Sequence, residues 1–376
     1  MRVGLVGWAC RTGLGQLNAD LAGLAPWLSA WLVPEHPSLG MAGELLPAGK
    51  AVPCAASGDE PRYERFLDAV DAILFVERQY VREGFDLVEG AHARRKLVCA
   101  IPMMEFLRDD EPWLSRAELL WAPTRWSRAE LRALAARRAC LARTSGDPRW
   151  RSPWAHRVAG GRLGVDLARF SFHPRERCER FLFVNGRGGY LGRKGADLVA
   201  RAAALVPEIP LRVRSQVALP ELPPHVEVDL RDAPERDALY AGADVLLAPS
   251  RWEGFGHTLY EAQACGLPVL TTGAPPMDEC GGTRLPVARS ALLKARRRLR
   301  SHEVAPEALA RAMGALHGRP LGAASRAARR RMERQHDLRR TLVALCGALE
   351  RAWRARPPQR RAGVQVPASL APSSER

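Results

Sequence analysis

The sequence lacks the motifs that would mark a metal site or a disulfide framework. Eight cysteines are scattered over 376 residues, without a Cys-x-x-Cys pair or a nearby histidine at metal-ligand spacing. The nine histidines are also dispersed, and the chain contains neither a His-Glu-x-x-His helix nor an aspartate-rich loop. We therefore expect reduced thiols, as in a cytoplasmic protein, and no metal or other cofactor.

Long apolar runs are missing as well. The chain begins Met-Arg-Val-Gly-Leu-Val-Gly, a strand pattern without the apolar core and small-residue cleavage site of a signal peptide. The apolar stretch 21–33 contains Pro26 and is too short to span a bilayer. We expect no targeting segment and no transmembrane anchor, so the predicted location is the cytoplasm.

Acidic residues are fewer than basic ones. The chain has 57 Lys and Arg residues and 41 Asp and Glu residues, which gives a net charge of +16. The cations cluster at 94–96, 294–300, 329–331 and 339–340. Aromatic residues are not interleaved with them as a base-stacking surface requires, so we expect no nucleic-acid partner. Two interpretations stay open. The clusters form solvated helix faces, or they attract an anionic surface at the inner face of a membrane or a lipid-phosphate acceptor.

Short apolar segments alternate with helical patterns along the chain, which is typical of parallel sheets covered by helices. The strands expected in the first half are 3–6, 28–33, 72–76, 96–101 and 119–122. Those expected in the second half are 181–185, 211–214, 226–230, 245–248 and 268–271, with helices at 196–205, 235–241, 307–316 and 325–353. A further helix should begin near Ser127, and the polar segment 144–160 indicates an approaching boundary. The predicted fold class is therefore α/β, with two doubly wound parallel-sheet domains.

The segment from Trp252 to Thr272 contains two glutamates eight positions apart, Glu253 on a glycine loop and Glu261 on a helix. Gly254 and Gly256 allow the loop to turn tightly and to approach a ligand. Thr258 is the expected N-cap of the helix. Free amides at a helix start attract an anion, and carboxylates on either side accept hydrogen bonds from hydroxyl groups. This combination suits a phosphate joined to two sugars.

Residues 242–272 resemble the donor site of retaining GT-B glycosyltransferases of glycosyltransferase family 4 (group 1), in which such a pair of glutamates surrounds a Gly-Phe-Gly loop. The segment 164–170 resembles the Gly-Val-Asp-x-x-x-Phe sequence that closes the first domain in this family. The resemblance implies two Rossmann-like domains with a cleft between them. We assign 1–165 to the N-terminal acceptor-side domain, 166–325 to the nucleotide-sugar domain, 326–356 to a helix that returns to the first domain, and 357–376 to a disordered tail.

The loop 186–195 contains five glycines and three cations, a composition suited to holding phosphate. In the family, an arginine of this loop and the lysine of a Lys-Gly pair bind the donor diphosphate. Lys194 and Gly195 match that pair. Either Arg187 or Arg193 could supply the arginine, and we favour Arg187 because it preserves the Gly-Arg start of the loop.

The loop after the first strand contains Gly13 and Gly15. In the family that the chain resembles, the glycines of this loop lie close to the transferred sugar and the donor phosphate, so both are candidate site residues. A plain tight turn is the alternative for these two glycines. A dinucleotide fingerprint is not complete in this loop, because Asn18 stands where its last glycine belongs. Leu191 interrupts the fingerprint of the second-domain loop in the same way, so a dehydrogenase is disfavoured.

Many relatives have a histidine after the fourth strand of the first domain, whereas this chain has Ile-Pro-Met-Met-Glu-Phe at 101–106. Glu105 is a candidate substitute that binds a hydroxyl or stabilises charge, or else it is a surface or capping carboxylate. His257 either contacts the donor sugar or caps the helix. For Asp278 and Glu279, helix capping is the simpler interpretation, with the cleft wall as the alternative.

The resemblance implies transfer of a hexosyl group from a nucleoside diphosphate sugar, with retention, to a glycan, lipid-linked or small-molecule acceptor. Glu253 would bind the sugar and Glu261 the ribose, while Gly256, His257 and Thr258 would offer amides to the phosphates. Preplaced cations would stabilise the departing diphosphate without a metal. The alternative is a non-catalytic GT-B protein that binds a nucleotide sugar or assists a second transferase.

Overall fold

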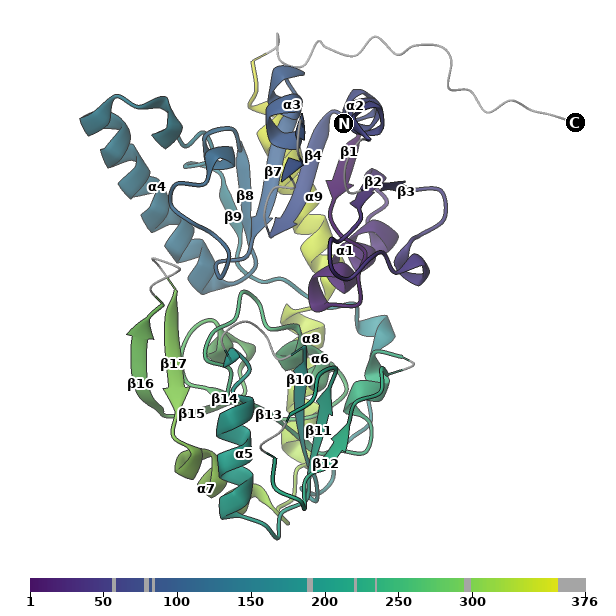
Figure 1. Cartoon of the computed structure of the whole chain (residues 1–376), viewed down its shortest axis with the longest axis vertical. Coiled ribbons are helices and arrows are strands. Elements are labelled where there is room, and N and C mark those ends of the chain that lie inside the picture. The colour runs from purple at the N-terminus through teal and green to yellow at the C-terminus, as the bar shows by residue number, and fades with distance from the viewer. Residues whose placement is uncertain are drawn as a thin grey trace, which may run out of the picture.

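Two parallel sheets organise the chain, one in each of two lobes that follow one another along the long axis (Figure 1). The computed structural model describes the chain except for residues 56–58, 78–80, 83–84, 188–191, 220–221, 234, 294–298 and 358–376. The predicted tail 357–376 lies outside the described residues apart from Pro357. Within the described ranges, no helix is long and apolar enough to cross a membrane.

The sheet of the first lobe has the strand order β3-β2-β1-β4-β7-β8-β9, and every neighbouring pair is parallel. Its strands are β1 (Val3–Val6), β2 (Leu28–Pro34), β3 (Ala51–Cys54), β4 (Ala72–Glu77), β7 (Leu97–Pro102), β8 (Leu119–Ala122) and β9 (Val158–Gly160). The helices are α1 (Gly13–Leu24), α2 (Glu60–Ala69), α3 (Leu87–Ala93) and α4 (Arg125–Ser145), with short turns η1 (Gly43–Leu45), η2 (Pro112–Ser115), η3 (Pro148–Trp150) and η4 (Leu167–Arg169). A small antiparallel pair, β5 (Val81–Arg82) and β6 (Phe85–Asp86), follows β4.

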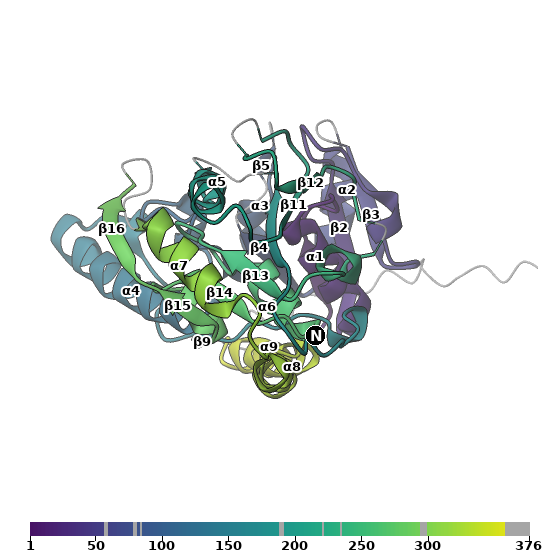
Figure 2. The same ribbon diagram turned by 90° about the horizontal axis from the view of Figure 1, so that it is seen from below.

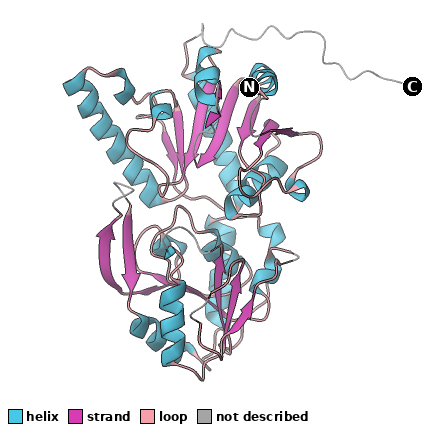
Figure 3. Ribbon diagram, in the orientation of Figure 1, coloured by secondary structure: helices cyan, strands magenta, loops and turns pink. Residues whose placement is uncertain are grey.

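The second lobe repeats this plan with the order β12-β11-β10-β13-β14-β15, again all parallel. Its strands are β10 (Phe181–Gly186), β11 (Leu211–Ser215), β12 (Glu227–Asp229), β13 (Val245–Ala248), β14 (Val269–Thr272) and β15 (Thr283–Leu285). The helices are α5 (Ala196–Leu205), α6 (His257–Ala264) and α7 (Pro306–Leu316), with turns η6 (Asp237–Tyr240) and η7 (Met277–Cys280). An antiparallel hairpin of β16 (Val287–Leu292) and β17 (Arg300–Val304) stands beside this sheet (Figure 3).

Helices α8 (Gly322–Gln335) and α9 (Leu338–Arg354) follow one another along one edge of the molecule (Figures 1 and 2). α9 packs against β7, β8, β9 and α1 of the first lobe. Its C-terminal end is fixed there by the buried guanidinium of Arg356, which lies 3.2 Å from Glu118 and donates to the carbonyl of Lys96. The chain thus crosses between the lobes twice, before β10 and again before α9.

The strands predicted from apolar segments are present, whereas four predicted helix limits are wrong. The helix predicted over 235–241 is only the short 3-10 turn η6. α4 begins at Arg125 rather than at Ser127, because Thr124 is the N-cap and exchanges hydrogen bonds with Ser127 in a capping box. α6 has Gly256 as its N-cap, with a φ of +83°, so Thr258 is the second helical residue. The helix predicted over 325–353 is interrupted between α8 and α9, because Asp337 caps the second helix.

The polar segment 144–160 also contains more than a boundary, since it supplies the edge strand β9. Sequence patterns also did not reveal β3, β15, the pair of β5 and β6, or the hairpin of β16 and β17. These strands lie at sheet edges or outside the main sheets, where exposed positions dilute the apolar pattern that marks a buried strand.

The start of α1 is pressed against the loop that follows β1. A Cβ atom at Gly15 would lie 2.0 Å from the carbonyl oxygen of Cys10, which is closer than packed atoms approach. A Cβ atom at Gly23, on the same helix, would meet no atom within 4 Å. Gly15 therefore permits the contact between helix and loop, whereas Gly23 is an ordinary helical position.

Gly15→Ala should destabilise the protein by roughly 1–3 kcal/mol or more, because backbone atoms must move. Gly23→Ala is the matched control and should stabilise it by about 0.5–1 kcal/mol through helix propensity. Chemical denaturation of both variants measures the free energy of unfolding. Equal effects of the two substitutions would contradict the proposed contact.

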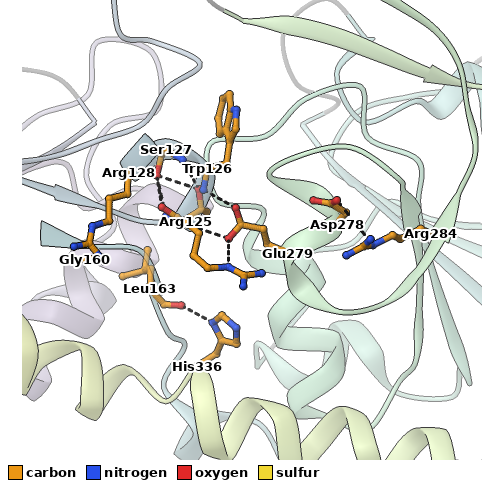
Figure 4. Close-up of polar contacts among 11 residues, drawn as sticks. Arg125, Trp126, Ser127, Arg128, Gly160, Leu163, Asp278, Glu279, Arg284 and His336 are labelled. Carbon is orange, nitrogen blue, oxygen red and sulfur yellow. Dashed lines mark hydrogen bonds and ion pairs between the residues drawn. The ribbon is translucent and has the colours of Figure 1, made fainter. Parts of the chain in front are cut away.

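A carboxylate of the second lobe caps a helix of the first lobe (Figure 4). Glu279 on η7 accepts hydrogen bonds from the backbone nitrogens of Arg125, at 2.9 Å, and Trp126, at 2.6 Å, in the first turn of α4. The guanidinium Nε of Arg125 lies 3.4 Å from the same carboxylate. A negative charge is favourable at this end of a helix. The capping predicted for Glu279 thus occurs across the lobes, whereas the neighbouring Asp278 lies near Arg284, at 3.9 Å.

Glu279→Ala should lower the free energy of unfolding by about 1–2 kcal/mol, the usual cost of losing an N-terminal cap. Asp278→Ala removes the same charge from the preceding residue and should change the free energy of unfolding by less than about 0.5 kcal/mol. Denaturant titrations of the two variants make the comparison. A larger loss in the Asp278 variant would show that charge, not capping, matters at this position.

Candidate active site

A cavity of about 420 Å³ opens between the two lobes. Its walls come from the loops after β1, β4 and β7 in the first lobe, and from the loops after β10 and β13 in the second. The strand order reverses between β1 and β4 in one sheet and between β10 and β13 in the other. Loops at the carboxyl ends of strands diverge at such switch points and leave room for a ligand. The topology therefore directs both sheets toward one site.

The glycine-rich loop after β10 supplies the cations of the cavity. Arg187, Arg193 and Lys194 all line it, whereas residues 188–191 lie outside the described part of the chain. Gly195 has a φ of +78° and precedes α5, and a Cβ atom there would lie 2.6 Å from the carbonyl oxygen of Pro249. A glycine at this position is therefore required to hold Lys194 against the loop that follows β13.

Glu253 is buried at the centre of these cations. Its carboxylate accepts hydrogen bonds from Lys194 Nζ, at 2.7 Å, and from Ser250 Oγ, at 2.9 Å, and Arg193 Nη1 lies 3.6 Å away. Burial alone would raise the pKa of the Glu253 carboxyl, but Lys194 and Arg193 hold it at about 2. Glu253 is therefore ionised throughout the physiological range.

Glu105 lies opposite, in the position predicted from the missing histidine. Arg193 Nη1 is 3.3 Å from its carboxylate, so one guanidinium joins Glu105 of the first lobe to Glu253 of the second. Burial raises the pKa of Glu105, and the charge of Arg193 opposes that effect. A Cβ atom at Gly254 would lie 1.8 Å from Glu105 Oε2, so a larger residue at this position would displace the Glu105 carboxylate.

Of the two arginines considered for phosphate binding, Arg193 is engaged by carboxylates and only 22% of its side chain is exposed. Arg187 also lines the cavity, is exposed, and has no ion-pair partner among the described residues. Arg187 is therefore the cation that an incoming anion can reach without breaking an existing pair. The choice of Arg187 stays a prediction.

The start of α6 forms another part of the wall, where Gly256, His257 and Thr258 line the cavity. Burial lowers the pKa of His257 to about 4, so its ring is neutral near pH 7. The ring packs edge-on against Phe255, with 5.0 Å between centroids. Its Nε2 is buried and has no hydrogen-bond partner among the described residues. A Cβ atom at Gly13 would lie 3.4 Å from His257 Nδ1, so Gly13 brings the first lobe close to this ring.

Two predicted site residues do not line the cavity. Glu261 is buried behind its wall, where it is paired with Arg236 and accepts a hydrogen bond of 2.7 Å from the hydroxyl of Tyr240. Burial would raise the pKa of Glu261, and Arg236 holds it below its usual range. Arg236 also donates to Asp20 in α1, at 2.6 Å, which is a third link between the lobes. The other residue, Gly15, contacts the Cys10 backbone instead.

Sequence reasoning missed four residues that complete this arrangement. Arg236, Tyr240 and Ser250 hold the two glutamates, and Glu77 lines the cavity at the end of β4. Ser250 lies within the donor-site segment 242–272, three residues before Glu253, but was not singled out there. Arg236, Tyr240 and Glu77 lie outside that segment, and their positions relative to the site are set by the fold. Within the described ranges, no group of three or more His, Cys, Asp and Glu side chains could hold a metal ion.

Solved structures with the same architecture include glycosyltransferases. A glycosyltransferase from Rickettsia africae matches with a TM-score of 0.63 at 12% identity, over 94% of this chain and 99% of that one. The lipopolysaccharide outer core galactosyltransferase WaaB matches with a TM-score of 0.60 at 14% identity, over 93% and 99%. At such low identities these matches establish the fold, and the GT-B fold predicted from the sequence is confirmed.

Residues 188–280 match the family model described as glycosyl transferases group 1. D-inositol 3-phosphate glycosyltransferase of Pseudarthrobacter chlorophenolicus is 36% identical over 138 residues, which cover 29% of this chain and 32% of that protein. A GDP-mannose-dependent phosphatidylinositol dimannoside mannosyltransferase of Mycobacterium tuberculosis is 31% identical over 192 residues, 46% of each chain. The matches thus span a third to a half of these relatives. They confirm the resemblance to group 1 glycosyltransferases inferred from the donor-site motif.

The lowered pKa of His257 predicts a pH dependence of stability. The folded state keeps the ring neutral down to about pH 4, whereas the unfolded chain binds a proton below about pH 6.5. The contribution is complete above pH 6.5 and is lost as the pH falls toward 4. Since one pKa unit corresponds to about 1.4 kcal/mol and the ring is partly exposed, we expect a loss of roughly 2 kcal/mol.

His257→Gln should reduce the slope of the free energy of unfolding against pH between 6.5 and 4.5, measured by denaturant titration at several pH values. A smaller slope should remain, because burial also lowers the pKa of His336 to about 4. His156→Gln, at an exposed position, is the control and should keep the wild-type slope. The contribution of Glu253 falls only below pH 4.5, so the slopes are compared between pH 6.5 and 4.5. An unchanged slope in the His257 variant would rule out a buried neutral ring.

Proposed function

We propose that this chain is a retaining glycosyltransferase that moves a hexosyl group from a nucleoside diphosphate sugar to a hydroxyl acceptor in the cleft. The observation that supports this function best is the convergence of three cations, a helix start and a buried ionised glutamate on one cavity between two switch points. The name of the M. tuberculosis relative makes GDP-mannose the first donor to test.

In this proposal the diphosphate lies between Arg187, Lys194 and the first amides of α6. As the nucleoside diphosphate departs, negative charge develops on its oxygens. Cations that are already in place stabilise this charge without any rearrangement of the protein. The departing phosphate can itself accept the proton of the acceptor hydroxyl, so no protein base or metal is required. Glu253, with one oxygen on Lys194, would accept a hydrogen bond from a sugar hydroxyl.

Glu261 remains the candidate for the ribose hydroxyls, with one condition. Both of its oxygens already have partners, Arg236 and the Tyr240 hydroxyl. Ribose binding would therefore require Glu261 to share or exchange one of them. If Glu261 does not exchange a partner, its role is structural, because it fixes the guanidinium of Arg236 that also donates to Asp20. Substitution of Glu261 would then affect stability more than nucleotide affinity.

We also propose a cytoplasmic site of action with peripheral contact to an anionic membrane surface. The outer faces of α8 and α9 expose Arg330, Arg334, Arg339 and Arg340, and Val343 among them is 75% exposed. Exposed cations on the same helices as an exposed apolar side chain favour a surface that is both anionic and apolar. A solvated arginine-rich face is the alternative, and binding to phosphatidylglycerol vesicles would distinguish the two.

Thermal unfolding with UDP, GDP, ADP and their sugars should identify the donor, because a ligand that binds only the folded state raises its stability. With that nucleotide, Arg187→Ala should weaken binding roughly 10-fold or more, the usual effect of losing one charged hydrogen bond. Its melting temperature without nucleotide should stay near the wild-type value, since the side chain is exposed and has no ion-pair partner among the described residues.

Arg201→Ala removes the same charge from the exposed face of α5 and should keep wild-type affinity. Lys194→Ala should in addition slow transfer strongly. The proposal fails if no nucleotide raises the melting temperature, or if the Arg187 and Arg201 variants bind equally. Donor binding without hydrolysis or transfer to any acceptor would instead favour a non-catalytic GT-B protein.

A further inference from the structure

Arg251 lies behind the charged groups of the cavity, in the loop between β13 and Glu253. It does not line the cavity itself, and its side chain is only 12% exposed. A largely buried guanidinium is costly unless its donors are paired. The partners of Arg251 therefore show which parts of the site this residue holds together.

Arg251 is bound to the glycine-rich loop at two successive carbonyls. Its Nη1 donates to the carbonyl oxygen of Gly192 at 2.7 Å, and its backbone nitrogen donates to that of Arg193, also at 2.7 Å. Gly192 has a φ of +65°, and a Cβ atom there would lie 3.3 Å from Arg251 Nη1. The same Gly192 carbonyl accepts from the Gly195 nitrogen at 3.0 Å, which closes the turn that contains Lys194. One arginine thus fixes the backbone directly before this lysine.

Helix α5 holds the guanidinium in place. Asp197, in the first turn of α5, accepts hydrogen bonds from Arg251 Nη1 at 2.8 Å and from Nη2 at 2.6 Å. Two parallel bonds of this kind fix the plane of a guanidinium, which a lysine cannot reproduce. The hydrogen bonds from Arg251 hold the pKa of Asp197 below its usual range. The start of α5 is therefore a fixed support for Arg251.

Strand β17 supports Arg251 from another side. The backbone nitrogen of His302 donates to the carbonyl oxygen of Arg251 at 2.9 Å, and the Glu303 carboxylate lies 3.7 Å from Arg251 Nε. The hairpin of β16 and β17 lies beyond residue 280, where the match to the family model ends. Arg251 is thus held by α5 and β17, and both supports act on the loop that supplies the cations of the cavity.

We propose that Arg251 is a positioning residue for the donor phosphates, because it holds the turn 192–195 and thereby keeps Lys194 at the cavity wall. Lys194 Nζ is 2.7 Å from Glu253, so the ammonium has a defined place before any ligand arrives. A cation on a loop that is already ordered binds an anion without the entropic cost of ordering that loop. The inference rests on the proposed function, since it concerns the phosphates of the same donor.

Arg251→Ala should speed amide hydrogen exchange over 192–197 roughly 10-fold or more, measured by mass spectrometry on the full chain without ligand, because a charged hydrogen bond to this turn is lost. Arg212→Ala is the matched control. Arg212 is 19% exposed, lies 2.8 Å from Glu227 and donates to the Ala241 carbonyl, but it does not line the cavity. This variant should leave exchange over 192–197 unchanged.

GDP, UDP and ADP, each compared with its nucleoside by ligand-observed NMR, test the phosphate role. Arg251→Ala should weaken binding of the preferred diphosphate roughly 10-fold and change binding of its nucleoside by less than about 2-fold. A purely structural defect would weaken both ligands alike, and Arg212→Ala should keep the wild-type ratio. Arg251→Lys preserves the charge beside Asp197 but cannot also hold Gly192 with a planar fork, so it should lose at least about 3-fold in diphosphate affinity.

Wild-type exchange over 192–197 in both Arg251 variants would overturn the inference, as would equal weakening of the diphosphate and its nucleoside. These outcomes are separable from failure of the proposed function. Diphosphate binding that is the same in the wild type and in both Arg251 variants leaves the transferase proposal intact and removes the phosphate role of Arg251. Binding of none of the three diphosphates by the wild type contradicts the transferase proposal, whereas faster exchange in the Arg251 variants would still support its hold on the loop.

Discussion

The site depends on one guanidinium that is shared by carboxylates of different lobes. Arg193 lies between Glu105 after β7 and Glu253 after β13, and Lys194 holds the second of these at 2.7 Å. Any of these charges buried alone would be costly, so each requires the others. The network therefore joins the lobes at the cavity and fixes the side chains that a ligand would meet. Electrostatic catalysis requires such groups to be in place before charge develops.

Charged contacts of the same kind recur around the interface between the lobes. Arg236 joins Glu261 to Asp20 in α1, and Glu279 caps the first turn of α4. Each uses a charge from the second lobe to satisfy a group of the first. Together with the network at Arg193, they fix the interface at three separate places. Any change in the angle between the lobes must break or exchange at least one of these contacts, which gives domain motion a definite cost.

The cations that line the cavity among the described residues all come from the second lobe, on the loop after β10. They suit an anion that stays with this lobe. Carboxylates line the cavity from both lobes, Glu253 from the second and Glu77 and Glu105 from the first. Arg193 lies between Glu105 and Glu253, so the cationic loop is tied to carboxylates of both lobes.

The sequence by itself determined the α/β class, nearly all central strands and the donor-site motif, because buried parallel strands read as short apolar runs and the glycine loops follow them directly. It also indicated Lys194, Glu253 and Glu105 as candidates, and the fold brings these three to one cavity. Only the tertiary structure decided that Glu261 lies behind the wall on Arg236, that Glu279 caps a helix of the other lobe, and that Glu77 faces the cleft. These contacts join residues up to 154 positions apart, and a local pattern contains no information about which distant element folds against it.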